Sequence, residues 1–125
     1  MSYLTNPYRF VTGGASWSTA SDNCILGGGT ASLWTATNTA MKWNGTAWSN
    51  ITALPADRQL LVGGGNFDSA IMISGDSGGT TSNEDDVYGW DGSSWNTLAP
   101  ISIDNQMVCG GGNTTDAIWA SGTYS

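Results

Sequence analysis

The hexapeptide WDGSSW at residues 90–95 has a near copy, WNGTAW, which lies 47 residues earlier at 43–48. The nonapeptide DRQLLVGGG at 57–65 recurs at the same spacing as DNQMVCGGG at 104–112. Self-similarity at a fixed period of about 20 to 50 residues is the signature of a repeat protein, in which each repeat is one supersecondary unit. The sequence therefore predicts an array of similar units with a period of 47 residues.

Glycine triplets offer a second way to align the units. They stand at 27–29, 63–65 and 110–112, so the first two are only 36 residues apart. This alignment predicts that the first unit is 11 residues shorter than the second. It also predicts that the first unit lacks a counterpart of the loop around residues 76–84.

Each full unit is predicted to contain four short strands. In the second unit they are expected at 60–62, 70–75, 86–90 and 94–98, in runs rich in β-branched and aromatic residues. Asp91-Gly92 supplies the turn chemistry of a tight hairpin between the last two strands. No window combines helical spacing of apolar residues with helix caps. The fold class is therefore all-β, and four short strands at this period predict the blade of a β-propeller.

The two ends of the chain resemble half units. Residues 102–125 supply only two inner strands and residues 1–20 only two outer strands, beside whole blades at 21–55 and 56–101. Three blades cannot close a ring, because propellers have about four to eight. We expect a homodimer that forms a six-bladed ring, in which the first segment of one chain completes the last blade of the other. A nine-bladed trimer is the alternative.

Composition narrows the range of partners. Ten acidic residues against three basic ones give a net charge of −7, whereas nucleic acids and anionic membrane surfaces require basic patches. We therefore expect neither as a partner. The sequence shows no signal peptide and no apolar stretch near the ~20 residues that a transmembrane helix needs, so we expect a soluble protein.

The second unit resembles a kelch repeat. Six residues separate Tyr88 from Trp95, and the run LPADR at 54–58 is similar to the Leu-Pro-x-x-Arg that opens a kelch blade. Two departures are that Gly75 alone stands where kelch repeats have a glycine doublet, and that Met41 replaces the tyrosine in the first blade. The glycine triplet on the first strand is a third departure.

The WNGxxW motif and the glycine-rich first strands are most similar to kelch-like repeats in structural proteins of marine bacteriophages. This resemblance implies a kelch-like β-propeller that acts without catalysis in the virion, as a capsid decoration protein or an appendage subunit. Its partners would be a second copy of itself and other virion proteins.

The aromatic side chains divide into two predicted groups. Most are expected to pack within and between blades, because such rings need large side chains for their cores. Trp43 and Trp90, beside the turns, are expected to be the more exposed pair and are the candidates for contact with a ligand or partner. If these two bind glycans by stacking, the chain is a carbohydrate-binding propeller lectin, which is the alternative function. The residues assigned to the blade core and to ring closure are Tyr8, Phe10, Trp17, Trp48, Tyr88, Trp95 and Trp119.

No catalytic, metal-binding or cofactor-binding residue is predicted. The chain has no histidine, and no helix or lysine follows the glycine triplets, as a phosphate-binding loop would require. The acidic residues at 84–86, with Asp76, contain the oxygen ligands that Ca²⁺ prefers, but they are expected to form a solvated loop. Cys24 and Cys109 are expected to be free thiols, because the glycine alignment puts them on the same face of equivalent strands.

Overall fold

The two hexapeptides form the tight hairpins that their sequence predicts. In the computed structural model of the chain, the backbone turns at Gly92 with a φ of 94°. The Asp91 Oδ1 atom accepts hydrogen bonds from the N–H groups of Ser93 and Ser94, at 2.9 and 2.8 Å. Bonds from these two residues hold the pKa of Asp91 well below its usual range. Asn44 Oδ1 accepts the equivalent pair of bonds in the earlier hexapeptide.

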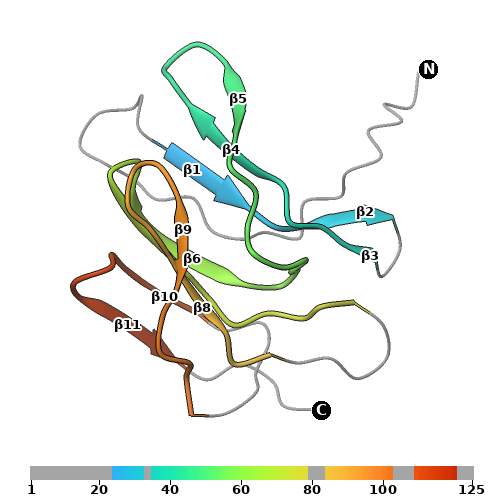
Figure 1. Cartoon of the computed structure of the whole chain (residues 1–125), viewed down its shortest axis with the longest axis vertical. Coiled ribbons are helices and arrows are strands. Elements are labelled where there is room, and N and C mark those ends of the chain that lie inside the picture. The colour runs from blue at the N-terminus through green and yellow to red at the C-terminus, as the bar shows by residue number, and fades with distance from the viewer. Residues whose placement is uncertain (1–23, 33–34, 79–83, 103–108, 121–125) are drawn as a thin grey trace.

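The structure describes residues 24–32, 35–78, 84–102 and 109–120, which contain eleven strands and no helix (Figure 1). Over these ranges, then, no helix exists that could span a membrane. The strands are β1 Cys24–Gly27, β2 Thr30–Ser32, β3 Thr35–Ala36, β4 Ala40–Trp43, β5 Trp48–Ile51, β6 Val62–Asn66, β7 Ser69–Ile73, β8 Val87–Trp90, β9 Trp95–Thr97, β10 Cys109–Gly112 and β11 Ala117–Ala120.

The second unit is a four-stranded antiparallel sheet in the order β6-β7-β8-β9. This confirms the four strands expected for a full unit, and none of the sheets is closed on itself. Strand β6 begins at Val62 rather than at Leu60, where the prediction put it. Leu60 has a φ of 56°, a left-handed conformation that a regular strand does not contain.

The third unit repeats the first half of the second one. Strands β10 and β11 pair so that Gly110 lies opposite Trp119, just as Gly63 lies opposite Met72 47 residues earlier. The two inner strands expected for this unit are therefore present. The half unit expected at 1–20, with Tyr8, Phe10 and Trp17, lies outside the described residues, as does the start of the unit predicted at 21–55.

The first unit shows that the alignment on the glycine triplets is wrong. Strand β1 pairs with β4 as β7 pairs with β8, so β1 is the second strand of its unit and not the first. Beyond β1, Gly28 and Gly29 have φ values of 72° and 119°. Their structural equivalents Ser74 and Gly75, beyond β7, have φ values of 63° and 115°.

Backbone hydrogen bonds show the same correspondence. The N–H of Gly28 donates to the Thr39 carbonyl at 2.9 Å, and the N–H of Ser74 donates to the Asp86 carbonyl at 2.7 Å. The loop between β1 and β4 is therefore the counterpart of the loop between β7 and β8, and the expectation that the first unit lacks it is wrong. Glycine clusters occur at two different places in the repeat, and the sequence alone does not distinguish them.

The second glycine cluster lies where neighbouring first strands meet. A Cβ atom on Gly64 in β6 would lie 2.5 Å from the backbone nitrogen of Gly112 in β10, closer than real Cβ atoms come. This agrees with the expectation that glycine in the first strands permits close backbone approach.

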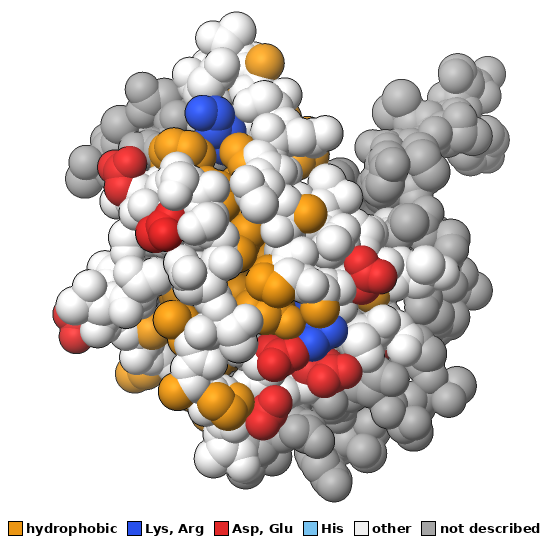
Figure 2. Space-filling model, in the orientation of Figure 1, with side chains coloured by type: hydrophobic (Ala, Val, Ile, Leu, Met, Phe, Trp, Pro, Cys, Tyr) orange, Lys and Arg blue, Asp and Glu red, His pale blue; other side chains and the backbone are white. Residues whose placement is uncertain are grey.

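The four-stranded sheet is buried on both faces, and each face forms one core. One core lies against the three-stranded sheet β1-β4-β5, and Figure 2 shows hydrophobic side chains at the surface along that boundary. The other lies against β10-β11. The buried residues of the first core are Ile25, Leu54, Leu61, Ala70, Met72, Tyr88 and Trp90. Those of the second core are Ile71, Ile73, Val87 and Ile101.

Candidate functional site

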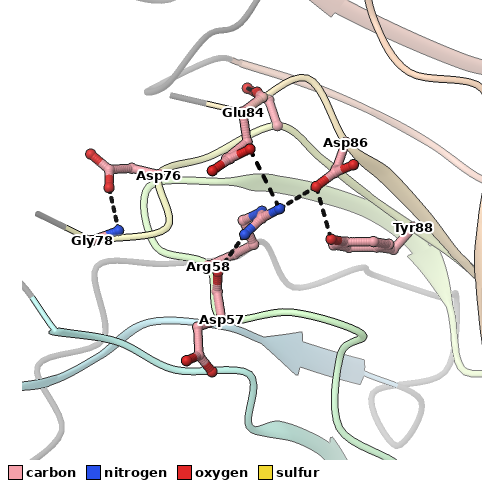
Figure 3. A network of polar contacts seen from close by, with 8 residues as sticks. Asp57, Arg58, Asp76, Gly78, Glu84, Asp86 and Tyr88 are labelled. Atoms are coloured by element: carbon pink, nitrogen blue, oxygen red, sulfur yellow. Dashed lines mark hydrogen bonds and ion pairs between the residues drawn. The ribbon is translucent and has the colours of Figure 1, made fainter. Parts of the chain in front are cut away.

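A buried arginine lies at the junction of the first and second units (Figure 3). Arg58 is 5% exposed, and its guanidinium donates from Nη2 to Asp86 Oδ2 and from Nη1 to the Asp57 carbonyl. Glu84 Oε2 lies 3.8 Å from the same Nη2 atom. The Tyr88 hydroxyl donates to Asp86 Oδ2 at 3.1 Å. The Asp86 carboxylate thus joins Arg58, in the linker before β6, to Tyr88 in strand β8.

The backbone of this linker pairs on both sides. The N–H of Arg58 donates to the Thr37 carbonyl at 3.1 Å, in the loop that follows β1. Gln59 exchanges two hydrogen bonds with Asp76, in the loop that follows β7, at 2.9 and 2.8 Å. The linker therefore holds the equivalent loops of two successive units together. Two buried donors, Arg58 Nε and Gln59 Nε2, have no hydrogen-bond partner among the described residues.

The charged and polar groups around Arg58 have the properties of a structural junction between units. Burial, acting against the attraction of Arg58, raises the pKa of Tyr88 to about 12, so its hydroxyl keeps its proton and remains a donor at neutral pH. Two of the four carboxylates considered as Ca²⁺ ligands, Asp76 and Asp86, already accept hydrogen bonds. Asp86 accepts bonds from two side chains, and Asp76 Oδ1 accepts the N–H of Gly78 at 2.5 Å. The part of the chain that the structure describes contains no group of three or more metal-ligating side chains.

The structure corrects the expected position of Trp90. This side chain is 2% exposed, and its indole N–H donates to the Phe67 carbonyl at 2.7 Å. It is buried because β8 turns Tyr88 and Trp90 toward the first unit, so Trp90 has no surface to offer a ligand. Trp43, its equivalent in the first unit, is half-buried and packs against Trp48 with the ring centroids 5.6 Å apart.

The three other described tryptophans occupy different environments. Trp95 packs on Trp90 at 5.2 Å and donates its indole N–H to the Thr52 carbonyl of the first unit at 2.9 Å. Trp119 is half-buried against the second core. Trp48, expected to pack between units, is instead 40% exposed. The two tryptophans Trp48 and Trp95 occupy equivalent positions in the repeated hexapeptides, and the sequence does not show which of them a neighbouring unit covers.

Cys24 is a free, half-buried thiol, and burial raises its pKa. The side chain of Cys109 lies outside the described part of the structure. The pairing of β1 with β4 contradicts the glycine alignment that placed both cysteines on the same face. That alignment therefore gives no information on whether they form a disulfide.

No protein-family model and no curated protein sequence matches the chain. Among solved structures, the chain is similar to YjhT, with a TM-score of 0.63 and 16% sequence identity over 82% of its length. The match covers 36% of YjhT, so the chain spans about a third of that structure. At this identity the likeness concerns the fold and carries no function with it.

Proposed function

We propose that the chain forms three blades of a kelch-like β-propeller, and that a second copy closes the ring. The observation that carries the proposal is the repeated docking of sheets. The first sheet covers one face of the second, and the third covers the other. An array built by such a rule stays open at both ends until another array closes it.

We further propose that this ring is a structural component of a bacteriophage virion, a capsid decoration protein or an appendage subunit. The support is the resemblance of the WNGxxW repeats and glycine-rich strands to those of phage structural proteins. The ring would act by rigid binding, with its loops docking on other virion proteins. Charged residues make up only 10% of the chain, which suits contacts made by polar and apolar groups rather than by ion pairs.

The test is the protein content of purified particles. Virions from cells carrying the gene are banded by density, and peptides of this chain are quantified against the major capsid protein by mass spectrometry. The proposal expects a fixed stoichiometry that survives washing in high salt. Absence of the chain from banded particles would contradict the virion role.

Carbohydrate binding is the second candidate function, and the adjacent pair Trp43 and Trp48 favours it. These rings lie beside a turn with exposed polar residues, and Trp48 is 40% exposed. Exposed aromatic faces next to hydrogen-bonding groups are what sugar rings stack on. A glycan array would test this function. Binding that is lost in Trp48→Ala and kept in Ser49→Ala, on the same strand, would support a lectin.

A further inference from the structure

The first unit presents an apolar face whose equivalent is buried in the second unit. Strand pairing matches Trp48 with Trp95 and Trp43 with Trp90. We call this surface the tryptophan face. In the second unit the equivalent positions on β7 and β8, including Trp90 at 2%, are at most 4% exposed. In the first unit they are half-buried, and Trp48 is 40% exposed. The tryptophan face consists of Cys24, Leu26, Met41, Trp43 and Trp48.

The third unit presents the opposite kind of face. Ile118 in β11 is 77% exposed, whereas its equivalent Ile71 in β7 is 6% exposed. We call Ile118 and Ala120, which is also exposed, the isoleucine face. In the second unit the same face packs on the third unit and contacts Trp119. The two open faces belong to the sheets at opposite ends of the array (Figure 1).

Gly111, on the isoleucine face, gives a further argument for a second molecule. Gly111 is the equivalent of Gly64, where the neighbouring strand leaves no room for a Cβ atom. At Gly111 an added Cβ would meet no atom of the described residues within 4 Å. The described part of the chain therefore gives no steric reason for glycine at this position. A strand of a second molecule, docked as β10 docks on β6, would give one.

We infer that two copies of this chain dock head to tail, with the tryptophan face of one covering the isoleucine face of the other. Within the chain, each unit already presents its isoleucine-type face to the tryptophan-type face of the next unit. The intermolecular contact has the same geometry as the contacts between units within the chain. In a ring of two copies it occurs twice, with the tryptophan face of each copy on the isoleucine face of the other. The inference rests on the proposed ring and specifies which surfaces close it.

The two faces carry no charge that would oppose the docking of a second copy. Each chain carries a net charge of −7, so two copies repel each other at long range. None of the seven residues of the two faces is charged. Lys42, on the other side of β4, lies over the Phe67 ring at 4.4 Å inside the chain. Association through these faces should therefore not weaken as salt is added, because salt screens the repulsion.

The test uses two variants of the full-length chain, Trp48→Asp and Ile118→Asp. Both side chains are exposed, so neither change removes a core residue. Each variant alone has one disrupted face in every head-to-tail contact, and we expect light scattering to find monomers. The loss of a buried aromatic anchor typically weakens association by about 30-fold or more. An equimolar mixture should recover a complex of one copy of each, because one intact face remains on each partner.

Matched controls place the same charge elsewhere. Ser49→Asp lies on β5 but on its other face, and Thr115→Asp lies in the exposed turn before β11. Both should keep the wild-type mass. Circular dichroism of all variants checks that they are folded. Gly111→Ala adds a substitution without charge, and we expect it to weaken association while leaving the spectrum unchanged.

Three outcomes would overturn the inference. If one variant alone keeps the wild-type mass, the contact joins like faces and is not head to tail. If the mixture stays monomeric, the two faces do not meet. If Trp48→Asp abolishes glycan binding and leaves the mass unchanged, the tryptophan face is a ligand site. The virion role is judged separately, by the content of purified particles, so either proposal can fail while the other stands.

Discussion

The indole N–H of Trp95 donates a 2.9 Å hydrogen bond to the backbone carbonyl of Thr52, 43 residues earlier, and so ties the second unit to the first. Trp95 also packs on Trp90, which is buried between the two sheets. One side chain thus combines a directed polar contact with apolar packing at the junction. If successive units are held by such contacts, weakening one of them should weaken the whole array.

Replacing Trp95 separates the two contributions. Trp95→Phe keeps a ring against Trp90 but loses the hydrogen bond, and we expect it to lower the free energy of unfolding by about 1 kcal/mol. Trp95→Ala loses the packing as well and should cost about 3 kcal/mol. Urea titration of both variants measures the difference. Equal stability of Trp95→Phe and wild type would show that the Thr52 contact contributes nothing.

Arg58 should be the most sensitive charged residue of the described part of the chain. Arg58→Met removes a buried guanidinium and leaves Asp86, whose side chain is 32% exposed, without its cation, and we expect a cost of about 2 kcal/mol. Asp57→Asn is the matched control, because Asp57 contributes only its backbone carbonyl to the junction and its side chain is exposed. We expect the control to change stability by less than about 0.5 kcal/mol. Similar losses from both changes would refute the role assigned to the guanidinium.

Asp91 should make stability depend on acid pH. Its pKa is lower in the folded chain than in the unfolded one, so its contribution is present above the unfolded pKa of about 4. That contribution is lost as the pH falls toward the folded value, because the protonated carboxyl accepts the turn hydrogen bonds less well. Asp91→Asn, which copies Asn44 of the first hexapeptide, should reduce the loss of stability between about pH 4.5 and pH 2.5. An identical acid dependence in both proteins would rule out Asp91 as its source.

Gly64 should resist substitution more than Gly111. A Cβ atom on Gly64 would lie 2.5 Å from the Gly112 nitrogen and 2.7 Å from its carbonyl oxygen, and backbone atoms cannot move aside cheaply. In the Ile118→Asp background, which removes effects of association, Gly64→Ala should cost about 2 kcal/mol. Gly111→Ala, with open space around its added Cβ atom, should cost much less. Equal costs would mean that β6 and β10 do not approach as closely as described.

The local parts of this fold were predictable from the sequence. Asp91-Gly92 and its copy at 44–45 encode their turns through side-chain acceptors and a glycine that takes a positive φ, and both turns form as predicted. The four strands of the second unit follow from β-branched and aromatic runs between turn residues. These signals are local, so a single repeat contains all of them.

The predictions from the sequence were wrong where one residue type has two physical roles. Glycine stands at positions 28 and 29 because the backbone leaves β1 with positive φ values, and at 64 because another strand approaches. A sequence alignment treats the two clusters as equivalent. The exposure of Trp48 and the burial of Trp90 were also beyond prediction, because each depends on whether another unit covers that face.

The native mass of the chain in solution tests the central claim most directly. The monomer mass is 13.0 kDa, and a ring closed by a second copy predicts twice that value by light scattering on a sizing column, at low and at high salt. Three times the monomer mass would indicate a ring of three copies joined by the same faces. A chain that stays at the monomer mass at high concentration would contradict the account, since the tryptophan face would then have no second copy to cover it.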